Sequence, residues 1–167
     1  MRTPDDYKRL STELSLDFEL LDKLAGKHAK AVVRAKLSPE DDLGWAAVGY
    51  TIHNIYCLFE NYFLRIAKFF ENGLDPSSWH AELVGRMCIE VSGLRPRLFD
   101  PAFAQRIDTL RRFRHAFRNM YQGELDPRRL GILNDDLPGI LEDFKVWHEK
   151  FTVALSYIAA SLENPAD

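Results

Sequence analysis

The residues most able to do chemistry lie in one short stretch, LRRFRHAFRNMY at positions 110–121. It contains four arginines and a histidine, and apolar residues stand between them at helical spacing. A guanidinium offers N–H donors in a planar fork that matches the oxygens of a phosphate. An imidazole can accept and release a proton near neutral pH. These residue types together indicate an anion site, with proton transfer beside a phosphate as the chemistry they could perform.

On a helix each residue turns by about 100°. The residues from Phe103 to Gln122 then fall into three kinds of position: a basic face, an apolar face and the boundary between them. The basic face carries Arg111, His115, Arg118 and Gln122. The apolar face carries Phe103, Ile107, Leu110, Phe117 and Met120. Arg114 and Tyr121 fall at the boundary between the two faces. We therefore expect Arg114 to be half-buried, where a charge without a partner would be very costly.

Two interpretations of Arg114 stay open. In the first, Arg114 pairs with a carboxylate of the preceding long helix, for which Glu60 is the obvious candidate, and the other arginines form a solvated face. In the second, Arg114 belongs to a phosphate clamp, to which Asn119 and Tyr121 add polar contacts.

The positive charge is confined to one part of the chain, although the whole chain has a formal net charge of −3. Residues 86–129 contain ten arginines, no lysine and five acidic residues, which is an excess of five positive charges, so the remainder carries −8. A local basic patch on a mildly acidic protein favours one anion site over a general coating of nucleic acid.

The elements that position these residues are predicted to be helices, because the hydrophobic periodicity is helical nearly throughout. It predicts an all-α fold, a single-domain up-and-down bundle of about five helices. The expected helices cover residues 4–36, 39–72, 76–91, 101–122 and 138–162, with one helical turn after residue 126. The second of these is apolar on two sides, so it should lie between neighbouring helices.

The expected helix boundaries come from acidic or hydroxyl residues that precede proline within two positions. The predicted N-caps are Ser38, Asp75, Asp100, Asp126 and Asp136. Residues 1–163 are expected to form one domain, and residues 164–167 a frayed tail.

The longest apolar run is too short to span a bilayer, and the first residues lack the apolar core of a signal peptide. A cytoplasmic protein without membrane association is therefore expected. Cys57 and Cys88 are expected to be buried free thiols, since the sequence has no CxxC motif.

The string RHAFRNMY resembles the signature of the HEPN superfamily, specifically of the HepT-like toxins. That signature is arginine, a polar residue, about three residues, and then His-x-Tyr. Arg114 matches the motif arginine, His115 the polar position, Asn119 the histidine position and Tyr121 the tyrosine. A second block, HNIYCLFENYFLRIAKFFENGLDPSSWHAELVGRM at 53–87, is similar to the tyrosine–glutamate helix and WH-x-ELL-x-x-M segment of one HepT-like branch.

The resemblance implies the toxin of a toxin–antitoxin system, a metal-independent endoribonuclease that needs no cofactor and acts as a homodimer. Two motif helices would meet at the subunit interface and form one RNA cleft. The ribose 2′-OH would attack the adjacent phosphate, with histidine as general acid or base and arginines stabilising the phosphorane. The residues expected to contact RNA are Arg111, Arg118 and Gln122. The resemblance also implies a small nucleotidyltransferase antitoxin (MNT-type) that adds AMP to Tyr121.

The histidines are consistent with chemistry that needs no metal. None of the five has a second histidine or an E-x-x-H partner at helical ligand spacing. His28 and His148 show no partner pattern and are expected to be structural. His53 and Glu60, one heptad apart, are expected to form a buried polar pair that supports Arg114. His80 is a further candidate, for which a capping or core role is the alternative.

The sequence departs from the HepT-like pattern at Asn119, because an amide forms hydrogen bonds but does not transfer a proton near neutral pH. Three hypotheses follow. In the first, the protein is a ribonuclease in which Arg114, His115 and Arg118 do the work, with Asn119 beside them. In the second, it is a non-catalytic RNA- or nucleotide-binding module. In the third, it is a structural or regulatory partner protein whose arginines are held in internal ion pairs.

Overall fold

The computed structural model describes residues 2–71, 79–119 and 125–164, and within these ranges it consists of five helices and contains no β-strand. The helices are α1 (Pro4–Leu37), α2 (Asp42–Phe70), α3 (Trp79–Arg86), α4 (Pro101–Arg118) and α5 (Pro127–Glu163). The predicted all-α bundle of about five helices is confirmed.

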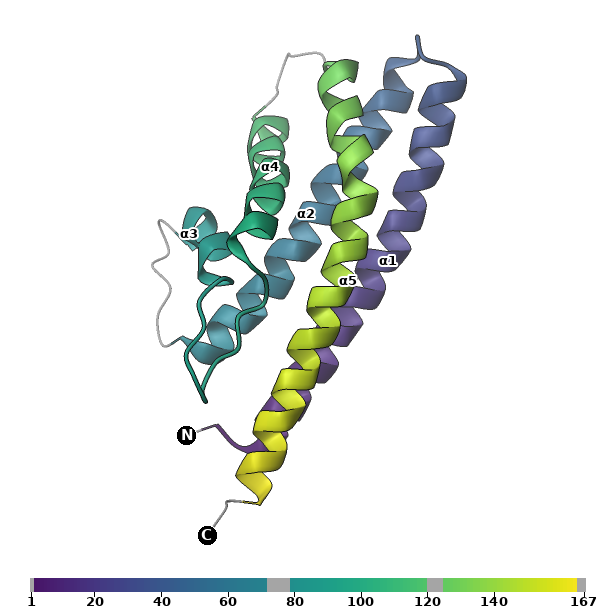
Figure 1. The fold of residues 1–167 in the computed structure, drawn as a ribbon. Helices are drawn as coiled ribbons and strands as arrows, with labels where there is room; N and C mark the ends of the chain where they lie inside the picture. Colours follow the sequence, from purple (N-terminus) through teal and green to yellow (C-terminus); the bar gives the residue numbers. More distant parts are fainter. Residues whose placement is uncertain (1, 72–78, 120–124, 165–167) are drawn as a thin grey trace.

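The long helix α2 lies at the centre of the arrangement (Figure 1). It forms an antiparallel hairpin with α1, α5 runs alongside this pair, and α3 and α4 lie on the other side of α2. Since α2 contacts all four other helices, the prediction that a helix with two apolar sides lies between neighbours is confirmed. The start of α1 and the end of α5 lie at the same end of the bundle, where Lys8 Nζ is 2.6 Å from Glu163 Oε1.

The start of α2 differs from the prediction, which placed the N-cap at Ser38. The N-cap is Asp41, whose Oδ1 accepts the backbone N–H of Leu43 at 3.0 Å. Pro39 lies in the turn before the helix, and its carbonyl accepts the indole N–H of Trp45 at 3.0 Å. The turn therefore includes Pro39 and Glu40, and the helix begins after Asp41.

The end of α3 also differs from the prediction, because the helix stops at Arg86 and does not reach residue 91. Gly93, at φ +73°, instead lets the chain turn back, and this is a conformation that favours glycine. The turn brings Arg95 under α3, where its buried side chain donates to Glu71 at 2.5 Å and to the Arg86 carbonyl at 2.8 Å. The predicted start of this helix, at residues 75–76, lies outside the described residues.

The last two predicted helices are one continuous helix, α5, which includes Pro138. The predicted cap Asp136 accepts a hydrogen bond from Arg106 of α4 at 3.0 Å and does not cap a helix. Leu137 and Phe144 on either side of the proline are fully buried. Packing along the bundle therefore outweighs the backbone hydrogen bond that proline cannot donate.

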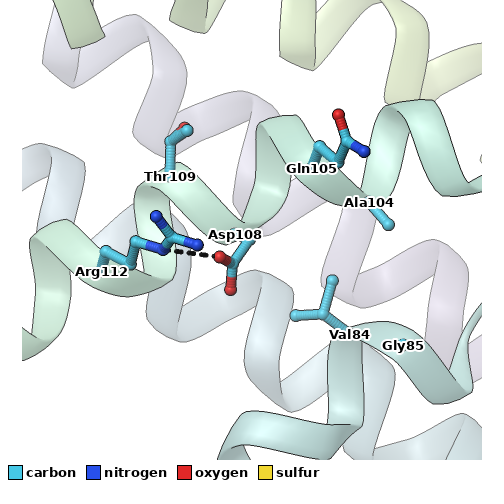
Figure 2. Close-up of a pocket in the computed structure, with 7 residues that line it drawn as sticks. All are labelled: Val84, Gly85, Ala104, Gln105, Asp108, Thr109 and Arg112. Carbon is cyan, nitrogen blue, oxygen red and sulfur yellow. Dashed lines mark hydrogen bonds and ion pairs between the residues drawn. The ribbon is translucent and has the colours of Figure 1, made fainter.

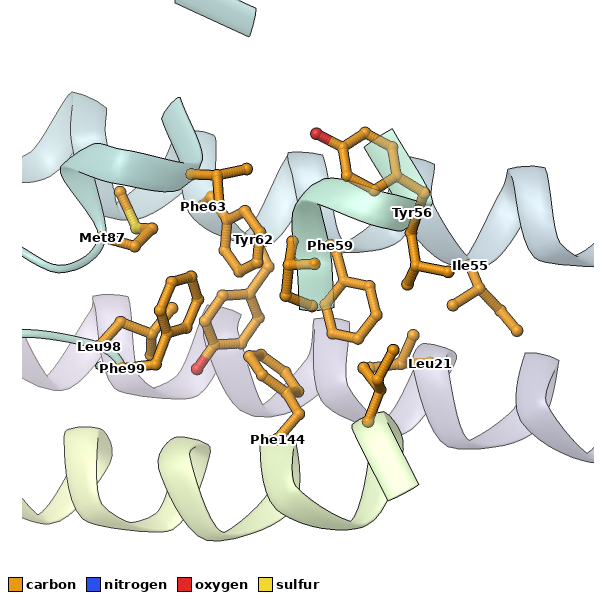
Figure 3. Close-up of a cluster of buried hydrophobic side chains, with 14 of the residues drawn as sticks. Leu21, Ile55, Tyr56, Phe59, Tyr62, Phe63, Met87, Leu98, Phe99 and Phe144 are labelled. Atoms are coloured by element: carbon orange, nitrogen blue, oxygen red, sulfur yellow. The ribbon is translucent and has the colours of Figure 1, made fainter. Parts of the chain in front are cut away.

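An aromatic cluster fills the core between α2, the segment before α4, and α5 (Figure 3). Phe59 and Phe144 meet edge to face with ring centroids 4.8 Å apart, and Phe63 lies 5.3 Å from Phe99 in the same manner. Such edge contacts are the favoured geometry between rings. They set the rotation of α2, and with it the positions of the polar residues that α2 presents to α4.

Three smaller predictions concern the chain as a whole. Cys57 and Cys88 are free thiols, but each is half-buried and not buried as expected. α5 ends at Glu163, and the tail prediction falls mostly on residues 165–167, which lie outside the described residues. No helix in the described ranges is both long and apolar enough to cross a lipid bilayer.

Candidate functional site

The basic residues of 110–121 lie on the C-terminal half of α4. Asp100 caps the helix by accepting the N–H of Phe103 at 2.7 Å, and a proline occupies the first turn, as predicted. The side chains of Phe103, Ile107 and Leu110 are buried and fix the rotation of the helix. As a result Arg111 is half-buried, whereas His115 and Arg118 are exposed.

Arg114 forms an ion pair with Glu60 of α2, with Nη2 3.2 Å from Oε2. The two side chains are only 16% and 9% exposed. The ion pair of the first interpretation is therefore confirmed. Its solvated face is wrong for Arg111, which is half-buried and bonded to Asp108. The pair leaves Arg114 Nε buried and without a hydrogen-bond partner among the described residues.

Tyr56 is a further member of this buried polar group, and the sequence analysis did not identify it. It precedes Glu60 by one turn of α2, is fully buried, and its hydroxyl has no partner among the described residues. Burial raises the pKa of the Tyr56 phenol, and the charge of Glu60 raises it further, whereas Arg111 and Arg114 lower it. The hydroxyl therefore stays protonated beside the ion pair. The sequence feature that could have identified Tyr56 is its four-residue spacing to Glu60, which places both side chains on one face of the helix.

Asp108 holds two arginines of α4, and it was also not identified from the sequence. Its carboxylate oxygens accept from Arg111 Nε at 2.6 Å and from Arg112 Nε at 2.7 Å. Burial raises the pKa of Asp108, but the hydrogen bonds and charges of the two arginines more than offset this, so the pKa lies below its usual value. Spacings of three and four residues along one helix place such partners together.

A hollow of about 520 Å³ borders Asp108 between α3 and α4. Figure 2 shows the Asp108–Arg112 bond in it, with Val84 and Gly85 of α3 facing α4. Its other lining residues are Ala104, Gln105 and Thr109. Asp108 therefore borders the hollow as an anion whose charge Arg111 and Arg112 compensate.

Asn119 ends α4 and contacts His115. Its Nδ2 donates to the His115 carbonyl at 2.9 Å and lies 3.4 Å from His115 Nε2. The helix stops at Arg118, earlier than the predicted end near residue 122. The structure thus brings His115, Arg118 and Asn119 together at one exposed helix end. Within the described part of the chain no carboxylate pairs with Arg118.

The remaining predicted site residues are placed differently. His53 is half-buried, and its ring centroid lies 5.4 Å from that of Phe117 of α4. Of the expected pair of His53 and Glu60, Glu60 is the residue that contacts Arg114. His80 belongs to α3, but its side chain lies outside the described part. Tyr121 and Gln122 lie outside the described residues altogether.

Two histidines are structural, as expected. His28 bonds to Thr51 Oγ1 at 2.7 Å and to Asn134 Oδ1 at 3.0 Å, and His148 bonds to the Tyr62 hydroxyl at 2.8 Å. Both are buried. In the described ranges no group of three or more His, Cys, Asp or Glu residues is arranged to hold a metal ion.

Comparison with known proteins identifies the family of this chain. A family model described as HepT-like protein matches residues 47–155, which is well over half of the chain. The chain belongs to the HepT-like family. The matched span begins within α2 and ends within α5, so it includes the whole basic face of this HepT-like protein and leaves out α1. No curated protein and no solved structure matches the chain.

Proposed function

We propose that this HepT-like protein is the toxin of a toxin–antitoxin system, a homodimeric endoribonuclease that needs no metal. Its RNA cleft would form where the C-terminal ends of two α4 helices meet. The observation that carries the proposal is the exposed cluster of His115, Arg118 and Asn119 at the end of α4, in a chain of this family. The cluster combines a proton-transfer group with a guanidinium that no described carboxylate neutralises.

The arginines of α4 would divide the work. Asp108 and Glu60 neutralise much of the charge of Arg111 and Arg114, so these two shape the base of the cleft. Arg118 lacks such a described partner and would be the stronger phosphate ligand, since no described carboxylate already neutralises its charge. This difference weighs against the hypothesis of a purely structural protein, in which each arginine would have its own carboxylate.

The proposed reaction breaks a P–O5′ bond by attack of the neighbouring ribose 2′-OH on phosphorus. A general base removes the 2′-OH proton, a 2′,3′-cyclic phosphate forms, and a protonated 5′-OH leaves. His115 is the residue of the exposed cluster that can carry the proton. Arg118 and its symmetry copy would stabilise the charge that builds on the phosphorane.

The test is cleavage of a single-stranded RNA in EDTA, with product ends analysed for a 2′,3′-cyclic phosphate. We expect His115→Ala to lower the rate at least 100-fold, within the range that general acid–base catalysis contributes. Arg118→Ala should lower the rate and weaken RNA binding. Arg97→Ala is the matched control, because Arg97 is exposed and lies before α4, away from the cluster. Unchanged cleavage by His115→Ala would exclude His115 as the proton carrier.

A non-catalytic RNA- or nucleotide-binding module is the second candidate, and the position of Asn119 favours it. Asn119, at the motif histidine position, donates a hydrogen bond from its side-chain amide to the carbonyl of His115 and caps the helix. In that case the protein binds RNA in a salt-dependent manner without turnover, and Asn119→His introduces cutting. Efficient cleavage by the unmodified protein would contradict this candidate.

The partner we propose is a small nucleotidyltransferase antitoxin that adds AMP to Tyr121. The proposal rests on the place of Tyr121 two residues after Asn119. A phosphate there would bring negative charge to the end of α4 and repel RNA. Incubation with the antitoxin and ATP should add one AMP per chain, and Tyr121→Phe should abolish the addition.

A further inference from the structure

A groove of about 480 Å³ lies on the opposite side of α4 from His115 and Arg118. It runs between the second half of α4 and the first turns of α5. The apolar residues that line it are Phe113, Ala116, Phe117, Leu125, Leu130, Ile132 and Leu133. Its polar lining residues are Thr109, Arg112, Asp126 and Arg129. Helical spacing separates this lining from the basic face by about half a turn.

One wall of the groove is aromatic. The rings of Phe113 and Phe117 lie 5.6 Å apart with an angle of 31° between their planes. Phe117 is supported from behind by His53, and a Cβ added at Gly49 would come within 3.1 Å of Phe117 Cε2. The absence of a side chain at Gly49 therefore makes room for the ring. The rings of Phe113 and Phe117 form a wall at the edge of the groove that is suited to stacking with a flat heterocycle.

The two arginines of the groove are available to an anion. The side chains of Arg112 and Arg129 are 76% and 88% exposed. Arg112 shares Asp108 with Arg111, and Arg129 Nε lies 3.9 Å from Asp126 Oδ2. The Arg129–Asp126 pair is exposed on both sides and contributes little energy. Asp108 is only 25% exposed, but it keeps its bond to Arg111 if Arg112 turns away, so a phosphate can recruit both guanidiniums at small cost.

We propose that this groove binds one unpaired nucleotide of an RNA strand. The base would stack in the apolar wall of Phe113 and Phe117, and the phosphate would lie at Arg112 and Arg129. The volume lies within the usual range of small-ligand sites, about 300–1,000 Å³. The two exposed arginines of the lining outnumber its one acidic residue, Asp126. This charge favours an anionic strand over a protein helix, which would need only the apolar wall. The inference rests on the proposed RNA function and adds a second contact that orients the strand.

The experiment measures binding of two fluorescent 2′-O-methyl strands of equal length, one with bases and one abasic. The 2′-O-methyl group removes the nucleophile, so cutting does not interfere. We expect the unmodified protein to bind the strand with bases about 10-fold more tightly, in keeping with about 1–3 kcal/mol per stacked base. Ile132→Asp should reduce this preference to less than about 3-fold, and thermal unfolding should show that the variant stays folded, because Ile132 is 72% exposed.

A charge variant tests the phosphate contact. Arg129→Glu should weaken binding of both strands about 5-fold, whereas the matched control Arg97→Glu should leave both unchanged. A preference for bases that survives in Ile132→Asp overturns the inference. If binding depends on Arg118 but on neither groove residue, the inference fails and the proposed function stands. If the unmodified protein binds neither strand, the proposed function itself fails. If groove variants change only the oligomeric mass in light scattering, the groove is a protein interface and the inference is again overturned.

Discussion

At the residue scale, the decisive feature is the pairing of Arg114 with Glu60 across α2 and α4. Both side chains are largely removed from water, so the contact between them offsets part of the cost of burying each charge. Tyr56 adds a buried hydroxyl to the same group. The pair therefore ties α4 to α2, and the exposed residues one helical turn further along α4 are held in place by it.

A double-mutant cycle should show this dependence. Removing one charge, in Arg114→Met or Glu60→Leu, should lower the free energy of unfolding by about 3–5 kcal/mol, because the remaining buried charge loses this ion-pair contact. The double variant should lose clearly less than the sum of the two. Urea unfolding measures all three, and Arg9→Met, in an exposed pair with Asp6, is the control that should change stability by less than about 1 kcal/mol. Additive losses would mean that the two charges do not stabilise one another.

At the element scale, His28 joins three helices. It lies on α1 and bonds to Thr51 of α2 and Asn134 of α5. Burial lowers the pKa of His28, an effect that the bond to Asn134 partly offsets, and burial also lowers the pKa of His148. The folded protein therefore takes up these protons less readily than the unfolded chain does.

Stability should consequently decrease in mildly acidic solution. In the unfolded chain a histidine has a pKa of about 6.5. The stabilisation that comes from keeping His28 and His148 neutral is therefore complete above that pH, and it is lost as the pH falls toward the lower pKa of the folded state. The free energy of unfolding in urea should be lower at pH 5.5 than at pH 7.5. His28→Gln should reduce this difference, because one of the two groups no longer titrates. Equal stability at both pH values in the unmodified protein would contradict a lowered histidine pKa in the bundle.

At the scale of the whole molecule, the proposed cleft requires two chains. His115 and Arg118 are exposed at one end of α4, and a single exposed helix end offers a phosphate little enclosure. A second copy related by a two-fold axis would double the arginines around one phosphate and exclude water.

Light scattering should accordingly give about twice the mass of one chain, which is 19.3 kDa. RNA cleavage per chain should fall steeply when the protein is diluted below the dissociation constant of the dimer, because monomers carry only half of the cleft. Activity that is proportional to concentration throughout, in a protein that is monomeric, would rule out a shared cleft.

Much of the fold follows from local sequence. The helical spacing of apolar residues predicts the five helices, and Asp100 and Asp126 act as N-caps before prolines as expected. The basic face of α4 also follows from spacing. These features depend on residues within about four positions of one another, whose relations along a helix are set by backbone geometry.

Only the tertiary structure decided which long-range partners these residues have. It selected Asp41 over Ser38 as the cap of α2, carried α5 through Pro138, and placed Tyr56 beside Arg114. It also ended α4 so that Asn119 meets His115. Each of these outcomes depends on burial and packing between helices, which outweigh the local preferences of single residues. The sequence by itself therefore determined the helices and their charged face, and packing determined which charges form internal ion pairs and which stay exposed.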